Sequence, residues 1–258
     1  MALVEAARIK QPRLGTRKLC YLLEQQLSSY KVGRDKLFSI LRVNNLLIKP
    51  RKQYRKTTDS KHWLKKHKNL TQHIELVKPE QLWVADITYI STREGHSYLS
   101  LVTDAYSKQI MGYHLSESLS ATGCLKALAM AIKERKYDHE LIHHSDRGLQ
   151  YCCDAYQQML LQAGIKPSMT EQYDPYENAV AERVNGILKD EFDLERGFVR
   201  HLEAVKVIKE SVEIYNQFRP HLSCGFLTPQ QMHQQQSVKL IKYKKKTSKT
   251  NVLEVNLN

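Results

Sequence analysis

The sequence predicts an α/β domain preceded by a small, all-helical unit. Leucines recur at helical spacing within residues 1–48, whereas apolar segments typical of strands begin at residue 81 and later alternate with helices. Strands followed by alternating helices and strands are typical of an α/β sheet. The chain has 258 residues, of which 41% are hydrophobic and 26% charged. This composition suits a folded protein with a sizeable core and excludes collagen-like and wholly disordered classes.

Residues 1–48 are expected to form a helix-turn-helix. The first helix has Thr16 as its expected N-cap, and a break at Ser28 leads to the second helix. The apolar stripes consist of Leu19, Leu22, Leu23 and Leu27 in the first helix and of Leu37, Ile40 and Leu41 in the second. Arg34 and Lys36 lie off the second stripe, as in a helix that contacts DNA. An ordinary helical hairpin would show the same spacing.

Two basic segments flank the sheet domain, which is expected over residues 76–236. Residues 49–75 are rich in lysine and arginine and poor in aliphatic residues, which predicts an extended linker that follows a phosphate backbone. The candidate DNA contacts in this linker are Arg51, Lys52, Arg55 and Lys56. Residues 237–258 are expected to form a basic, flexible tail.

The sheet domain is expected to begin with an antiparallel meander of three strands. These strands cover residues 81–90, 97–106 and 108–115. A helix after Ser120, a strand over 140–146, a helix over 153–163 and a fifth strand over 164–170 then follow. Pro167 interrupts the fifth strand.

The best-defined helix follows Thr170. Asp174 is a suitable N-cap, Pro175 suits the first helical position, and Glu177 completes a capping box. One side of the helix presents Asn178, Glu182, Asn185 and Lys189, and the opposite side presents Val180, Val184 and Ile187. Such a polar stripe is usually a solvated surface, but a carboxylate, two amides and a lysine are also suited to contact a ligand.

Charge is distributed unevenly along the chain. The formal charge is +13, and residues 1–80 carry 19 Lys and Arg against 6 Asp and Glu, whereas residues 81–238 carry 15 against 20. A basic surface of this size most often binds nucleic acid, whereas an acidic centre repels phosphate unless a divalent cation lies between them. The pattern therefore indicates a metal-dependent enzyme that acts on nucleic acid, with a solvated surface as the alternative.

The composition also bears on the cellular compartment. No apolar run approaches the length of a membrane helix, and the first twenty residues lack the apolar stretch of a secretory signal. The five cysteines include no CxxC pair, which argues against a disulfide framework and a zinc site. We therefore expect a cytoplasmic protein that has no membrane partner.

Three acidic residues are distinguished by their local sequence. Asp86 lies within an apolar strand, where a carboxylate is costly unless it is paired or binds a cation. Asp146 follows a strand just before a glycine turn, where α/β sheets usually place their sites, and Glu182 begins the polar side of the last helix. If these carboxylates converge, they can hold two Mg²⁺ ions for phosphodiester chemistry. Spacing alone leaves Asp104 and Asp154 as alternatives.

His143 and His144 lie next to Asp146 and invite a metal-binding or general-base role. Neighbouring residues of a strand point to opposite faces, so at most one of the two histidines can reach the site. The pair Cys152 and Cys153 is expected to pack in a helix. In the segment Arg219, Pro220 and His221, the proline is expected to end a helix.

Several segments resemble the catalytic core of bacterial insertion-sequence transposases in their order and spacing. They are WVADITYI, VTDAYSKQIMGYHL, HHSDRGLQY, the stretch from PSMT through YENAVAERVNGILKDEF, and YNQFRPHLSCGFLTPQQM. The sequence is most similar to the product of the second reading frame (OrfB) of the IS-three family, within the retroviral-integrase-like superfamily. The resemblance covers residues 1–235 and includes PRLGTRKL, which is similar to that family's helix-turn-helix.

The resemblance implies a ribonuclease-H-like fold, a mixed sheet flanked by helices, with a DDE triad. The two aspartates of the triad fall on Asp86 and Asp146, and its glutamate falls on Glu182. The last two are separated by 35 residues, the interval of the family's DD(35)E pattern. The family's basic residue seven positions after the glutamate falls on Lys189. The implied cofactor is Mg²⁺, as two ions, with Mn²⁺ as a substitute.

We therefore expect a transposase that cuts one strand at the ends of its element and joins the exposed 3′-OH to another phosphodiester. Lys189, Asn185 and Asn178 are the expected DNA contacts of the last helix, and Asn178 is also placed to position Glu182. The expected partners are double-stranded DNA (inverted-repeat ends and target), further copies of the chain assembled on DNA, and the upstream-frame protein (OrfA). The alternatives are a non-catalytic, sequence-specific DNA-binding protein (a repressor or domesticated transposase) and a Mg²⁺-dependent nuclease that cuts without joining.

Overall fold

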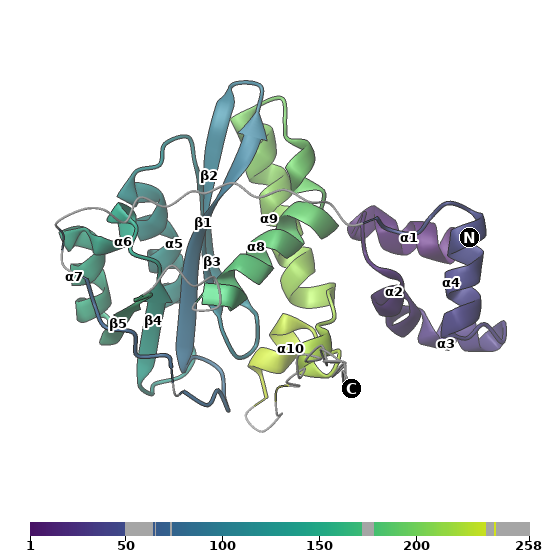
Figure 1. Ribbon diagram of the computed structural model, residues 1–258, viewed down its shortest axis with the longest axis horizontal. Coiled ribbons are helices and arrows are strands. Elements are labelled where there is room, and N and C mark those ends of the chain that lie inside the picture. Colours follow the sequence, from purple (N-terminus) through teal and green to yellow (C-terminus); the bar gives the residue numbers. More distant parts are fainter. Residues whose placement is uncertain (50–63, 65, 73, 172–177, 236–239, 241–258) are drawn as a thin grey trace, which may run out of the picture.

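The computed structural model describes residues 1–49, 64, 66–72, 74–171, 178–235 and 240. They form an α/β core and a helical unit that lies beside it (Figure 1). The expected DNA contacts Arg51, Lys52, Arg55 and Lys56, and nearly all of the tail 237–258, lie outside the described residues. No helix in the described part is long and apolar enough to cross a membrane.

The core is built on a five-stranded mixed sheet with the order β3-β2-β1-β4-β5. The strands are β1 (Leu82–Thr92), β2 (Gly95–Asp104), β3 (Ile110–Ser116), β4 (Leu141–Ser145) and β5 (Ile165–Met169). The first three form the antiparallel meander that the sequence predicts, and β4 and β5 continue the sheet in parallel. Pro167 fits within β5 because this strand lies at the edge of the sheet, where a missing N–H leaves no ladder bond unmade.

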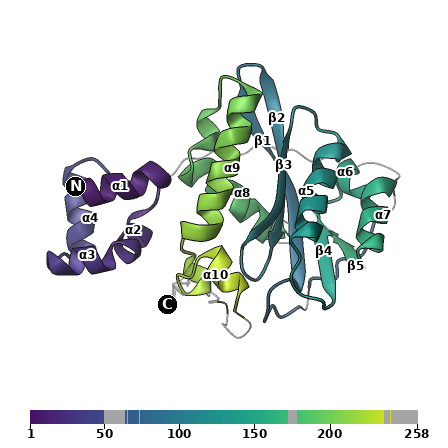
Figure 2. The ribbon, with the colours of Figure 1, turned by 180° about the vertical axis from the view of Figure 1, so that it is seen from behind.

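Helices cover both faces of the sheet (Figures 1 and 2). One face packs against α5 (Ala121–Lys133), α6 (Leu149–Cys152) and α7 (Asp154–Gln162), and the other against α8 (Ala179–Glu191) and α9 (His201–Phe218). Along β1, Trp83 and Ala85 pack on the α5 side, whereas Leu82 and Val84 pack near Ala181 of α8. Side chains alternate along a strand, so Asp86 also faces α8.

The helical unit consists of α1 (Ala2–Lys10), α2 (Thr16–Leu22), α3 (Glu24–Ser29) and α4 (Arg34–Val43). Its core is formed by Val4, Leu14, Leu19, Leu23, Leu27, Leu37 and Leu41. Two expectations for this unit were wrong. The residue before α2 is Gly15, and Thr16 is already helical. Leu22 is 37% exposed, because Leu19 and Leu23 face the core of the unit and Leu22 lies roughly 60° from Leu19 around the helix. The predicted single helix is also divided at Leu23 into α2 and α3.

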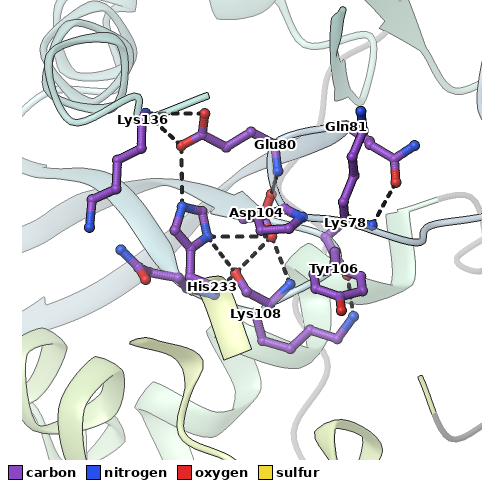
Figure 3. A network of polar contacts seen from close by, with 12 residues as sticks. Lys78, Glu80, Gln81, Asp104, Tyr106, Lys108, Lys136 and His233 are labelled. Carbon is purple, nitrogen blue, oxygen red and sulfur yellow. Dashed lines mark hydrogen bonds and ion pairs between the residues drawn. The ribbon is translucent and has the colours of Figure 1, made fainter. Parts of the chain in front are cut away.

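A buried polar cluster joins the short helix α10 (Pro229–His233) to the sheet (Figure 3). His233 places Nε2 3.2 Å from Oε1 of Glu80 and Nδ1 2.9 Å from the hydroxyl of Ser107. Asp104 accepts hydrogen bonds from the backbone N–H groups of Glu80 and Ser107. Burial alone would lower the pKa of His233, but the carboxylates of Asp104 and Glu80 raise it above its ordinary value. Asp104 is thus part of a structural cluster at the end of β2.

This cluster predicts a pH-dependent contribution to stability. A histidine whose folded pKa is raised stabilises the fold at low pH and loses this effect as pH rises through the raised pKa. His233→Gln should therefore lower the free energy of unfolding by about 1–3 kcal/mol at pH 6 and by less at pH 9. Urea denaturation at the two pH values measures the difference. An equal loss at both would contradict a charged His233.

Candidate active site

Asp86 lies in β1, on the face that α8 covers, and is only partly exposed. Its carboxylate accepts a hydrogen bond of 2.8 Å from Nδ2 of Asn185 on α8. A second hydrogen bond of 2.9 Å comes from the backbone N–H of Ile87. Two donors therefore fix the orientation of this carboxylate, one of them from the polar side of α8.

Burial is the largest cause that raises the pKa of Asp86 to about 7, and the charge of Asp146 raises it further. The hydrogen bonds from Asn185 and Ile87 oppose this effect, and Glu182 contributes a smaller repulsion. The charges of Asp146 and Glu182 thus lie close enough to Asp86 to act on its carboxylate. Carboxylates arranged in this way favour a cation between them.

Asp146 directly follows β4, the strand that pairs with β1 in parallel. The backbone N–H of Gly148 donates a 2.9 Å hydrogen bond to its Oδ1. A Cβ atom at position 148 would lie 3.0 Å from that oxygen, so a glycine leaves space for the carboxylate. The strand end and the glycine turn thus hold the Asp146 carboxylate in one orientation.

Glu182 occupies the first turn of α8 and is exposed. Helix α8 begins at Ala179 after Asn178, and the predicted cap residues Asp174, Pro175 and Glu177 lie outside the described residues. Asn178 donates a 3.0 Å hydrogen bond from Nδ2 to the carbonyl of Ala85, next to Asp86. The start of α8 is therefore attached to β1 beside the Asp86 carboxylate.

The polar side of α8 is only partly a solvent face. Asn178 and Asn185 are buried, at 7% and 5% exposure. In both, Oδ1 has no hydrogen-bond partner among the described residues. They are therefore not part of a solvated stripe, because the donor end of each amide is turned inward onto β1.

The carboxylate and amide oxygens near Asp86 suit a hard divalent cation, because Mg²⁺ prefers oxygen ligands of these kinds. Within the described residues, however, no group of three or more His, Cys, Asp or Glu side chains is arranged to hold a metal ion. The three carboxylates are neighbours but do not form a closed coordination sphere. The repulsion of the Asp86 carboxylate by Asp146 and, more weakly, by Glu182 opposes closure when no cation lies between them.

The two histidines that precede Asp146 have structural partners. Nε2 of His143 lies 2.9 Å from the hydroxyl of Tyr156, and burial, with His144 as a second cause, lowers the pKa of His143 to about 3. Nδ1 of His144 lies 2.8 Å from the hydroxyl of Ser168. Asp154 is exposed at the start of α7.

Cys152 is buried, and its sulfur lies 3.7 Å from the sulfur of Met169. Helix α9 ends before Arg219 and Pro220, as the sequence predicts.

The basic residues expected to contact DNA lie in several places. Lys189, in the last turn of α8, has Nζ 3.8 Å from a carboxylate oxygen of Glu195. Arg34 and Lys36 are exposed in the first turn of α4, where Arg34 forms an ion pair with Asp35. They are far from Asp86 along the chain and belong to a different unit of the fold.

Sequence reasoning missed a buried ion pair near the end of α8. The guanidinium of Arg219 is 1% exposed and donates two hydrogen bonds, of 2.9 and 2.8 Å, to the carboxylate of Glu191. No local pattern marks this pair, because its members are 28 residues apart, with Glu191 at the end of α8 and Arg219 directly after α9.

Comparison with known proteins agrees with this fold. Two models described as "Integrase core domain" match residues 77–175 and 163–229. The "Insertion element IS600 uncharacterized 31 kDa protein" of Shigella sonnei is 38% identical over 217 residues, which are 83% of this chain and 79% of that protein. "Transposase InsF for insertion sequence IS3A" of Escherichia coli (strain K12) is 32% identical over 233 residues, 90% of this chain and 80% of the relative.

The chain belongs to the insertion-sequence transposases of the retroviral-integrase-like superfamily. It is a DNA transposase, an enzyme of the DDE transposase and integrase class. A chain from a simian T-cell lymphotropic virus intasome matches it with a TM-score of 0.53 and 17% identity, over 90% of this chain and 79% of that one. This structural similarity confirms the ribonuclease-H-like fold that the transposase sequence predicts.

The raised pKa of Asp86 predicts that this side chain destabilises the metal-free transposase. A carboxyl with a raised folded pKa costs stability that grows as pH rises from about 4 to 7 and is complete above that value. Asp86→Asn should therefore raise the free energy of unfolding in EDTA at pH 8 by up to about 4 kcal/mol, and by less at pH 5. Chemical denaturation tests this, with Asp154→Asn as the exposed control. An Asp86→Asn protein that is less stable than the unaltered chain at pH 8 would contradict a destabilising charge at Asp86.

Proposed function

We propose that Asp86, Asp146 and Glu182 are the catalytic carboxylates of this transposase and that they hold two Mg²⁺ ions, for which Mn²⁺ can substitute. The raised pKa of Asp86 supports the assignment, because the charges of Asp146 and, more weakly, Glu182 add to the effect of burial on this carboxyl. The three residues come from β1, from the position directly after β4 and from α8. When bound, such ions activate an attacking oxygen and stabilise a leaving one.

In this proposal the two asparagines of α8 position the carboxylates. Asn185 orients Asp86 through its 2.8 Å hydrogen bond, and Asn178 fixes the start of α8 against Ala85. Because the donor end of each amide is used on β1, its Oδ1 remains available as an acceptor beside the site. Asn185 thus acts on Asp86, rather than only on the terminal nucleotides.

The reaction consists of two phosphoryl transfers. First, water attacks the phosphorus at the end of the element, and the bond between phosphorus and the 3′ oxygen breaks, which leaves a 3′-OH and a 5′-phosphate. This 3′-OH then attacks a second phosphodiester, forms a new P–O bond and releases the 3′-OH of the attacked strand. Neither step needs a covalent bond to the protein.

The basic residues are proposed to bind the DNA. Arg34 and Lys36 are exposed in the first turn of α4, a position that suits contact with the inverted-repeat ends. Lys189 lies on α8 with Glu182 and suits the terminal nucleotides. The helical unit of residues 1–48, the linker 49–75, the catalytic domain 76–236 and the tail 237–258 would then have separate roles. The proposed site of action is the bacterial nucleoid.

Joining two ends to a target requires at least two catalytic sites. We therefore propose that copies of the chain assemble on end DNA, and that the upstream-frame protein (OrfA) takes part in the cell. The strong positive charge supports DNA as the surface on which they assemble.

Substitution Asp86→Asn should lower strand cutting at least about a thousandfold while end binding survives, because the amide cannot supply the negative charge. The assay uses labelled duplexes bearing the inverted-repeat end, with and without Mg²⁺, and Asp154→Asn as the matched control. Normal cutting by Asp86→Asn would refute the triad. Binding without products from the unaltered chain would favour a repressor, and cut but unjoined products would favour a nuclease.

A further inference from the structure

The N-terminal helical unit is docked on the last turn of α8. The guanidinium of Arg13 lies 3.0 Å from Oδ1 of Asp190, and the backbone N–H of Arg13 donates to the carbonyl of Glu191 at 3.0 Å. Arg13 also donates to the carbonyl of Lys49, where the linker begins. The helical unit lies beside the side of the core that α8 and α9 cover, in both views (Figures 1 and 2).

Glu191 is the buried centre of this contact. Its carboxylate is 2.5 Å from Nζ of Lys18, in α2, and accepts two hydrogen bonds from Arg219 of the core. Burial would raise the pKa of Glu191, but the charges of Arg219 and Lys18 lower it below its ordinary range. Burial of most of the Lys18 side chain, with the charge of Arg219 as a second cause, lowers its pKa to about 8, so this side chain remains largely charged at neutral pH.

Two aromatic contacts extend the same surface. The rings of Tyr21 and Phe226 are stacked with their centroids 4.6 Å apart. Nζ of Lys10 lies 4.8 Å from the centroid of the Phe218 ring. The docked surface therefore includes α1, α2 and three separate segments of the core, more than an isolated surface ion pair would provide.

Helix α8 connects this surface to the catalytic carboxylates. Glu182 lies in its first turn, and Asp190 and Glu191 lie in its last, about 12–14 Å along one continuous helix. A helix of this length transmits a displacement of one end to the other. The orientation of the helical unit, which carries Arg34 and Lys36, is therefore tied to the position of Glu182.

We propose that this contact, the α8 clamp (Arg13, Lys18, Asp190, Glu191 and Arg219), is a positioning element that sets which phosphodiester of the element's end reaches the carboxylates. The inference rests on the proposed function, because it needs a helical unit that binds the end and a triad that cuts it. The clamp fixes the distance between the helical unit, which binds the end, and the carboxylates, which cut it. Its residues act through α8 and do not touch the reacting atoms.

The pair Arg13 and Asp190 allows a test that spares the core, since their side chains are 18% and 40% exposed. Asp190→Arg places two like charges together, and the double variant Arg13→Asp with Asp190→Arg restores an ion pair with reversed polarity. Glu134→Arg reverses a charge at the end of α5, on the opposite face of the sheet, and is the matched control. All variants are made in the full chain, and urea denaturation checks that each one folds.

The readout is the position of the 3′ nick, mapped at single-nucleotide resolution on a labelled inverted-repeat duplex with Mg²⁺. Asp190→Arg should lower the fraction of nicks at the wild-type position roughly tenfold and move the remainder to neighbouring nucleotides. The double variant should restore the wild-type position, and Glu134→Arg should not change it. A purely structural role would lower the total cutting without moving the nick.

The proposal is overturned if Asp190→Arg cuts at the wild-type position with unchanged accuracy, or if it cuts faster there, as release of an inhibitory contact would predict. If Asp190→Arg binds the end without cutting it, restoration of accurate cutting by the double variant supports the clamp, and failure to restore it refutes the clamp. An unaltered chain that does not cut at all would refute the proposed function, which is a separate result.

Discussion

Helix α8 is held across strand β1 by two asparagine side chains, and this contact fixes the helix that carries Glu182 against the strand that carries Asp86. Asn178 binds the backbone beside Asp86, and Asn185 binds the Asp86 carboxylate itself. The cost of this arrangement is a buried carboxylate whose pKa is raised by burial and by Asp146. The fold tolerates a local repulsion at this position, as expected where a site is built to receive cations.

The same helix also joins the two units of the chain. Its first turn carries Glu182, and its last turn carries Glu191, on which Lys18 and Arg219 converge. End recognition and strand cutting must be coordinated in a transposase. A single rigid element that contacts both units is a direct physical means of coordinating them.

Much of the fold follows from local sequence patterns. The meander, the position of Asp146 after β4 and the placement of Glu182 on a helix could be predicted, because strand and helix periodicity are properties of neighbouring residues. The resemblance to transposases selected the three carboxylates from many acidic residues. The helical repeat also identified Asn178 and Asn185, although not what they bind.

What the sequence did not predict depends on contacts between distant residues. The direction in which an amide of α8 turns depends on how closely the helix packs on β1. The pairing of Glu191 with Arg219 and Lys18 joins three segments that share no local pattern. Leu22 was misplaced for a related reason, since the packing of α2 within the helical unit decides which leucines of the stripe are buried. Tertiary packing, rather than propensity, decides each of these features.

Manganese binding tests the central claim most directly, because Mn²⁺ can be counted by electron paramagnetic resonance. The unaltered chain, bound to an inverted-repeat duplex, should take up two Mn²⁺ ions that Mg²⁺ displaces, and Asp154→Asn should do the same. Asp86→Asn and Glu182→Gln should each lose at least one ion. Equal uptake by all four proteins, or no specific uptake by the unaltered chain, would contradict a shared metal site formed by these carboxylates.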